Sequence, residues 1–237
     1  MSKSIRLLLI LLGLSCGLKA QDIDLQLLYD FGEDRDFLTS TVEMFNADAY
    51  GSTFFFIDMN YDANGVKGVS ESYWEITRSF TINEELPVAL HFEYDGGQGQ
   101  FAIDEENNQA YTISDAYLSG LDFIWNSEDF SSGVTFQTLY KYIRRTEQDS
   151  YQLTLVWYFN FLDGKVTFNG FADFWGEDSD FDHDGSVDAD TVFLSEPQIW
   201  YNFNEYWAGG SEIEFGHNFG GIEGWKVCPT IAVKHTF

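Results

Sequence analysis

The sequence has few of the residues that break strands or cross-link a chain. It contains only 3 prolines and 2 cysteines in 237 residues, so long uninterrupted strands are possible. Cys16 lies in an N-terminal segment that we expect to be removed, which leaves Cys228 alone. One cysteine cannot form an internal disulfide, so a disulfide-stapled fold is excluded. We expect Cys228 to be a small residue in a packed strand.

Basic residues are also scarce. The chain has 12 Lys and Arg against 39 Asp and Glu, a formal net charge of −27. A field of this sign repels nucleic acid and free phosphates and attracts cations, so we expect no nucleic-acid partner. The apolar fraction of 44% is ordinary, which excludes a disordered acidic tail. The acidic residues therefore belong to the strands and loops of a folded protein.

Long apolar runs and helical periodicity are missing beyond the first twenty residues, so no transmembrane helix is predicted. Within those twenty, Lys3 and Arg6 precede an apolar core at residues 7–14, and permissive residues lead to Ala20. This pattern predicts an export signal peptide at 1–20, cleaved near Ala20, and a mature chain of 21–237. The alternative is a lipoprotein signal acylated at Cys16, although Gly13 stands where a bulky aliphatic residue is usual.

What the sequence does contain is apolar residues at every second position. From Tyr151 to Phe161 one alternate set is apolar, and the intervening set from Gln152 to Asn160 is mostly polar. Asp163-Gly164 can both take positive φ, which predicts a tight hairpin into a second alternating strand at 166–174. Strands of about ten residues followed by turns recur along the chain, and about twelve can be counted.

This pattern favours an all-β fold, an antiparallel up-and-down transmembrane β-barrel in the cell outer membrane, surrounded by lipid. The 23 Phe, 13 Tyr and 7 Trp crowd the strand ends, where aromatic girdles belong. Short turns at 48–51, 126–132 and 163–164 fall on one side, whereas longer loops, among them 96–113 and 176–190, fall mostly on the other. Phe237 resembles the terminal signature read by the barrel-insertion machinery. The alternative is a soluble exported β-sandwich, whose apolar face a second sheet would cover.

In a barrel the polar strand faces line the lumen, and here they carry aromatic rings beside carboxylates. A ring can stack on a base or a sugar, and a carboxylate can accept hydrogen bonds from ribose hydroxyls. Such a lumen suits small, neutral, hydroxylated solutes and repels phosphorylated ones. The candidate lumen residues are Glu43, Phe54, Asp58, Tyr73, Glu75, Glu93, Phe171, Asp173, Trp175 and Trp200.

Four short motifs, TVEMF at 41–45, GSTFFFID at 51–58, YWEI at 73–76 and GFADFW at 170–175, resemble the Tsx-like nucleoside-specific channel-forming proteins of the outer membrane. The likeness is to a branch without assigned substrate. It implies a monomeric twelve-stranded barrel with a narrow pore lined by aromatic and ionisable residues. We expect facilitated diffusion of nucleosides and no required cofactor. The residues that match motif positions, and would therefore line the pore, are Glu43, Asp58, Glu75, Phe171 and Asp173.

A second motif places carboxylates at alternate positions around Gly185, as Ca²⁺-binding loops do. The candidate ligands in this loop, residues 180–190, are Asp180, Asp182, Asp184 and Asp188. Thr191 stands where an EF-hand has its bidentate Glu, so the motif is incomplete. The alternative is a solvated acidic loop, and strand parity places it outside the cell.

The strand pattern is also compatible with two other functions. A barrel plugged by its own side chains could act in binding or adhesion through the loops at 96–113 and 176–190. A barrel lipid hydrolase is a further alternative, and His91 with Glu93 is its only candidate pair on one strand face. The histidines are scattered and no Ser/His/Asp order stands out, so we do not expect an enzyme.

Overall fold

The computed structural model describes residues 22–237 except 34, 84–85, 105, 182–184 and 186–187. The expected signal peptide and the alternative acylation site Cys16 lie outside the described residues. The strands are β1 (Asp22–Asp30), β2 (Phe37–Asp48), β3 (Gly51–Tyr61), β4 (Val69–Thr81), β5 (Val88–Ala102), β6 (Asn108–Asn126), β7 (Ser132–Ile143), β8 (Gln148–Phe161), β9 (Val166–Ser179), β10 (Asp188–Ser195), β11 (Gln198–Asn202), β12 (Trp207–His217) and β13 (Trp225–Thr236). No helix long and apolar enough to cross a membrane occurs among these residues.

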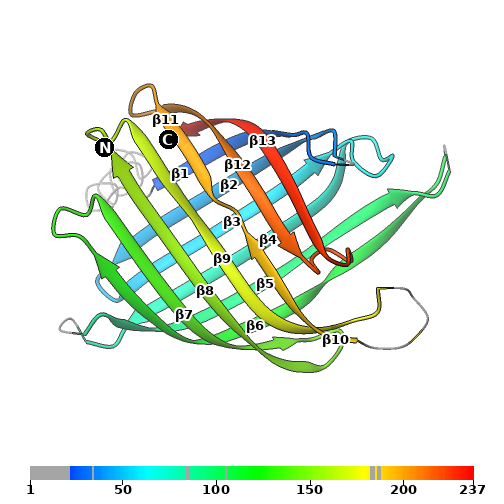
Figure 1. Cartoon of the computed structure of the whole chain (residues 1–237), viewed down its shortest axis with the longest axis horizontal. Helices are drawn as coiled ribbons and strands as arrows, with labels where there is room; N and C mark the ends of the chain where they lie inside the picture. Colours follow the sequence, from blue (N-terminus) through cyan, green and yellow to red (C-terminus); the bar gives the residue numbers. More distant parts are fainter. Residues whose placement is uncertain (1–21, 34, 84–85, 105, 182–184, 186–187) are drawn as a thin grey trace, which may run out of the picture.

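The strands form one closed antiparallel sheet. Consecutive strands pair from β1 to β9, and β13 pairs with both β12 and β1, so the sheet has no free edge (Figure 1). β10 and β11 both pair with β9 and β12 and together occupy one position. The thirteen strand segments therefore fill twelve positions, which confirms the expected twelve-stranded barrel and excludes the sandwich.

The break between β10 and β11 has a local cause. Pro197 has no backbone N–H to donate, and the strand is interrupted at this residue and at Glu196. The backbone N–H of Glu196 donates to the carbonyl of Phe171 at 3.1 Å, so the pairing with β9 continues across the break. Gly170 has φ of 150° and lies directly against Glu196. The alternation of apolar and polar residues from Phe193 to Phe203 predicts one strand, and Pro197 divides it into two.

The alternation of side chains determines which face of each strand meets lipid. In β8 the outward Tyr151 is 46% exposed, whereas its neighbour Gln152, which faces the lumen, is 6% exposed. Large apolar side chains are exposed in the same way around the whole outer surface. A continuous apolar belt of this kind on a closed barrel requires a bilayer, so the chain is an outer-membrane barrel.

Aromatic side chains cluster at both ends of the barrel. At the end where β1 begins, the His235 ring lies 4.5 Å from Trp207 and 4.7 Å from Phe237, centroid to centroid. At the opposite end the Trp225 ring lies 4.8 Å from that of His217. Two aromatic bands separated by an apolar belt are the girdles of outer-membrane barrels, as the sequence predicted.

The prediction that residues 96–113 form a loop is wrong, because most of this segment lies in strands. β5 continues to Ala102 and β6 begins at Asn108, so a long hairpin projects at the end opposite to the start of β1 (Figure 1). Its polar composition suggested a loop, but the segment is paired on both sides, and a Cβ on Gly99 would lie 2.3 Å from the ring of Tyr111. The predicted loop at 176–190 is also shorter, since β9 ends at Ser179 and β10 begins at Asp188.

The expected hairpin at Asp163-Gly164 is present, with φ of 55° and 78°. It is longer than the two residues predicted, because Leu162 also has φ of 55° and the turn spans 162–165. Cys228 is buried and unpaired, as expected of a small residue in a packed strand.

Candidate luminal site

All ten candidate lumen residues lie on the inward set of their strands. Residues directly opposite each other in an antiparallel pair point to the same face, so the register defines rows across the wall. One such row joins Glu43 on β2, Phe56 on β3, Glu75 on β4 and Asp95 on β5. Strands β2 to β5 therefore bring six of the candidates, from Glu43 to Glu93, onto one wall of the lumen.

Three rings on this wall form a continuous aromatic surface, here called the aromatic ladder: Phe54, Phe56 and Tyr73. The ring centroids of Phe54 and Phe56 are 6.1 Å apart, and those of Phe56 and Tyr73 are 5.9 Å apart. The hydroxyl of Tyr73 donates to Oε1 of Glu75 at 2.8 Å. The ladder thus ends beside a carboxylate.

Hydroxyl and amide donors fix several other carboxylates of the same wall. Oδ1 of Asp58 accepts from the Thr41 hydroxyl at 2.5 Å. Glu71 accepts from the Asn60 amide at 3.1 Å and from the hydroxyl of Tyr111. Each donor comes from a neighbouring or nearby strand, so the side-chain positions depend on the register as well as on the pattern of alternation.

His91 is 0% exposed and both its ring nitrogens are engaged by carboxylates. Nδ1 lies 2.8 Å from Oδ1 of Asp122, and Nε2 lies 3.1 Å from Oε2 of Glu93. The hydroxyl of Ser79 bonds to Asp122 and not to the imidazole. This arrangement lacks the serine–histidine contact of a hydrolase, so the geometry gives His91 a bridging role between two strands.

The remaining candidates lie on β9 and β11. The indole of Trp175 donates to Glu177 at 2.7 Å, and Lys141 lies over its ring at 4.4 Å. Trp200 is fully buried, and Lys234 lies over its ring at 4.2 Å. A solute could therefore reach the Trp200 ring only if Lys234 moved.

Asp173 on β9 interacts electrostatically with Glu75 and Asp95, although these belong to β4 and β5. Carboxylates from separate parts of the wall thus share one region of the lumen. The sequence missed the importance of Asp95 and Lys141 there. The only sequence signal for them was their place on polar strand faces, which many solvated residues share.

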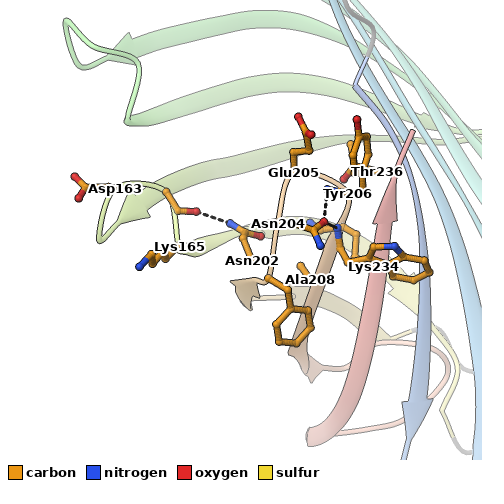
Figure 2. A pocket seen from close by; sticks show the side chains of 12 residues that line it. Asp163, Lys165, Asn202, Asn204, Glu205, Tyr206, Ala208, Lys234 and Thr236 are labelled. Atoms are coloured by element: carbon orange, nitrogen blue, oxygen red, sulfur yellow. Dashed lines mark hydrogen bonds between the residues drawn. The ribbon is translucent and has the colours of Figure 1, made fainter.

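A pocket of about 450 Å³ lies at the mouth where β1 begins, between the turn at 162–165 and the connection at 203–206 (Figure 2). Asn202 donates to the carbonyl of Gly164 at 2.7 Å, and Lys234 and Thr236 also line the pocket. Its volume falls in the range of small-molecule pockets, about 300–1,000 Å³. The sequence did not predict this pocket, because two turns distant in the chain build it.

The predicted calcium loop can be followed only in part. Oδ2 of Asp180 accepts from the backbone N–H of Gly185 at 3.1 Å. Asp182, Asp184 and the side chain of Asp188 lie outside the described residues. The calcium loop therefore stays a prediction.

Comparison with known proteins supports the fold. Residues 20–237 match the family described as "Domain of unknown function (DUF5020)". No curated protein gives a significant match. The structure titled "NanC porin structure in rhombohedral crystal form" is similar with a TM-score of 0.56 at 8% identity, covering 91% of this chain and 100% of that one. The "KdgM porin" is similar with a TM-score of 0.50 at 12% identity, covering 91% and 99%.

These likenesses show that the fold is that of outer-membrane porins. At such identities they carry no information on the solute. The resemblance to the Tsx-like family stays a prediction from the four motifs.

Proposed function

The chain belongs to the DUF5020 family and is an outer-membrane barrel with a porin-like fold, and from this premise we propose that it is a channel for facilitated diffusion. Its solutes are small, neutral and polar, and nucleosides are the expected class. No energy source and no covalent step are involved.

The aromatic ladder beside Glu75 is the observation that supports this proposal most. A base or a sugar face can move along Phe54, Phe56 and Tyr73 while its hydroxyl or amino groups donate to neighbouring carboxylates. Stacking on one ring contributes about 1–3 kcal/mol, enough to attract a solute and weak enough to release it.

The charge of the lumen supports the selection of neutral solutes. The inward faces of β2 to β5 carry five carboxylates, Glu43, Asp58, Glu75, Glu93 and Asp95. Lysine and arginine are scarce in the chain, so few basic side chains can offset them. A phosphorylated solute enters this field at an electrostatic cost that a nucleoside does not meet.

Swelling of proteoliposomes in isotonic solute tests the proposal. Vesicles that contain the refolded barrel should swell faster in adenosine than in AMP, and empty vesicles should swell in neither. Equal swelling in both solutes would show that the lumen does not select against phosphate.

One observation favours a second candidate. Trp200, His91 and Gln26 are inward-facing yet almost fully buried, which is how side chains that fill a barrel would pack. In that case the barrel would conduct little, and its connections at the outer end would carry a binding or adhesion function. The swelling assay separates the two candidates, because a filled barrel gives no swelling.

A further inference from the structure

Three luminal carboxylates from two neighbouring strands converge closely. Glu75 lies on β4, and Glu93 and Asp95 lie on β5, with Glu75 and Asp95 directly opposite each other. One oxygen of each carboxylate can be chosen so that all three lie within 4.8 Å of one another. Like charges this close repel unless a cation or a proton lies between them.

Two buried oxygens in this region have no hydrogen-bond partner. Asp95 is 5% exposed and Asp173 is 9% exposed, and Oδ1 of each accepts no hydrogen bond from the described residues. Asp173 comes from β9 and interacts electrostatically with both Glu75 and Asp95. A buried carboxylate oxygen without a donor is destabilising, so these two oxygens favour a partner that the described protein donors do not supply.

The nearest basic side chains are already engaged. Lys141 donates to the Gln152 amide oxygen at 2.8 Å and lies over the Trp175 ring, and it attracts Asp95 and Asp173 electrostatically without forming an ion pair with either. His91 is shared between Glu93 and Asp122. In the described part of the chain, His91 is the only ion-pair partner of any of Glu75, Glu93, Asp95 and Asp173. The cluster thus keeps an excess of negative charge.

We propose that Glu75, Glu93 and Asp95 form a luminal site for a divalent cation, with Ca²⁺ as the ion that fits and Asp173 as a further negative charge near it. The ligands are all carboxylate oxygens, which hard cations prefer. Oxygens on opposite sides of a Ca²⁺ ion stand roughly 4.6–5.2 Å apart, so carboxylate oxygens within 4.8 Å of one another can reach one such ion. Ca²⁺ also accepts irregular coordination, whereas Mg²⁺ demands a near-ideal octahedron, which three carboxylates on two strands do not supply.

A bound ion would change which charged solutes the channel favours. Glu75 also accepts from Tyr73, so the ion would lie next to the end of the aromatic ladder. A bound divalent cation neutralises part of the cluster, which lowers the barrier to anions and reduces the current carried by monovalent cations. This consequence rests on the proposed channel function, whereas binding of the ion does not.

Calcium titration by calorimetry of the refolded mature chain in detergent tests the binding. All samples carry, as a common background, the substitutions Asp182→Asn and Asp184→Asn. These remove carboxylates from the predicted calcium loop at 180–190, so that this loop does not contribute to the measured number of bound ions. We expect this background protein to bind one Ca²⁺. Adding Glu75→Gln with Asp95→Asn should weaken binding at least tenfold, whereas adding Glu212→Gln, a luminal carboxylate on β12 bonded to Gln198, should not.

Thermal unfolding shows whether the variants fold. The Glu75→Gln, Asp95→Asn protein without calcium should unfold at the same or a higher temperature than its background, because repulsion between buried carboxylates is removed. Calcium should raise the unfolding temperature of the background protein only. No binding by the background protein, or equal binding by the cluster variant, would overturn the proposal.

The two claims fail separately. Calcium binding by a barrel that passes no adenosine would support the calcium site and contradict the channel function. Passage of adenosine by a barrel that binds no calcium would support the channel function and contradict the calcium site.

Discussion

The guanidinium of Arg35 donates two hydrogen bonds to Glu214, from Nη2 to Oε1 at 2.8 Å and from Nη1 to Oε2 at 3.2 Å. Nη1 also donates to Oδ2 of Asp30 at 2.9 Å. Asp30 ends β1 and Glu214 lies on β12, so one arginine links strands on both sides of β13, where the barrel closes. Both carboxylates lie in the lumen wall and are largely shielded from solvent.

Replacing this arginine should destabilise the barrel strongly. Arg35→Met leaves two shielded carboxylates unpaired, and removing one partner of a buried ion pair costs about 3–5 kcal/mol. We expect a loss of about 3 kcal/mol in the free energy of unfolding, measured by urea titration of the refolded barrel in vesicles. The matched control is Arg144→Met, whose side chain is 66% exposed and pairs with Asp115 at 3.3 Å. The control should lose less than about 1 kcal/mol, and equal losses would refute a structural role for the closure contact.

The aromatic ladder should determine the affinity for adenosine. Phe56→Ala removes the middle ring, and a lost stacking contact of about 1–3 kcal/mol corresponds to a block of channel current that is roughly 5- to 150-fold weaker. Phe92→Ala is the control, because Phe92 lies on β5 with its side chain exposed on the outer surface. If the two variants weaken the block equally, the ladder is not the binding surface.

The break between β10 and β11 should depend on the glycine opposite to it. A Cβ on Gly170 would lie 2.4 Å from the carbonyl oxygen of Glu196, and φ of 150° is unfavourable for other residues. Gly170→Ala should therefore cost more than about 2 kcal/mol of unfolding free energy. A Cβ on Gly164 would have no atom within 4 Å, so Gly164→Ala is disfavoured only by the φ of 78° and should cost about 1 kcal/mol. A smaller loss at Gly170 than at Gly164 would contradict this account of the break.

The turn between β6 and β7 should be sensitive to acid. The hydroxyls of Ser127 and Ser131 and the backbone N–H of Ser131 donate to Asp129, which lowers the pKa of its carboxyl group to about 2. A carboxyl group whose pKa is lower in the folded state stabilises fully above its unfolded pKa, about 4, and loses that contribution as the pH falls toward 2.

The difference in unfolding midpoint between the natural chain and Asp129→Asn should therefore shrink between pH 4 and pH 2. A difference that stays constant over this interval would show that the hydrogen bonds to Asp129 do not favour its charged form.

Alternation in the sequence was sufficient to predict which side chains face lipid and which face the lumen. Tyr151 and Gln152 show why: in a strand, neighbouring residues must point to opposite faces, whatever the rest of the chain does. Strand ends were harder to predict. Gly96 to Gly99 have the composition of a loop, but the segment pairs with β4 and β6, and the rings of Tyr94 and Tyr111 lie against Gly96 and Gly99.

Within the site, the sequence predicted the residue types but not their partners. The bond between Lys141 and Gln152, and the position of His91 between Asp122 and Glu93, depend on the register between neighbouring strands. A shift of one residue would place every one of these side chains on the other face, and no short motif specifies the register. The mouth pocket depends in the same way on two turns that meet only in the closed barrel.

The most direct test of the channel is the current through single refolded barrels in a planar bilayer, first with adenosine and then with AMP. We expect a small, steady conductance that adenosine blocks at concentrations where AMP has no effect. A bilayer that shows no channel current, or a block of equal strength by both solutes, would contradict the assignment of the lumen as a path for nucleosides.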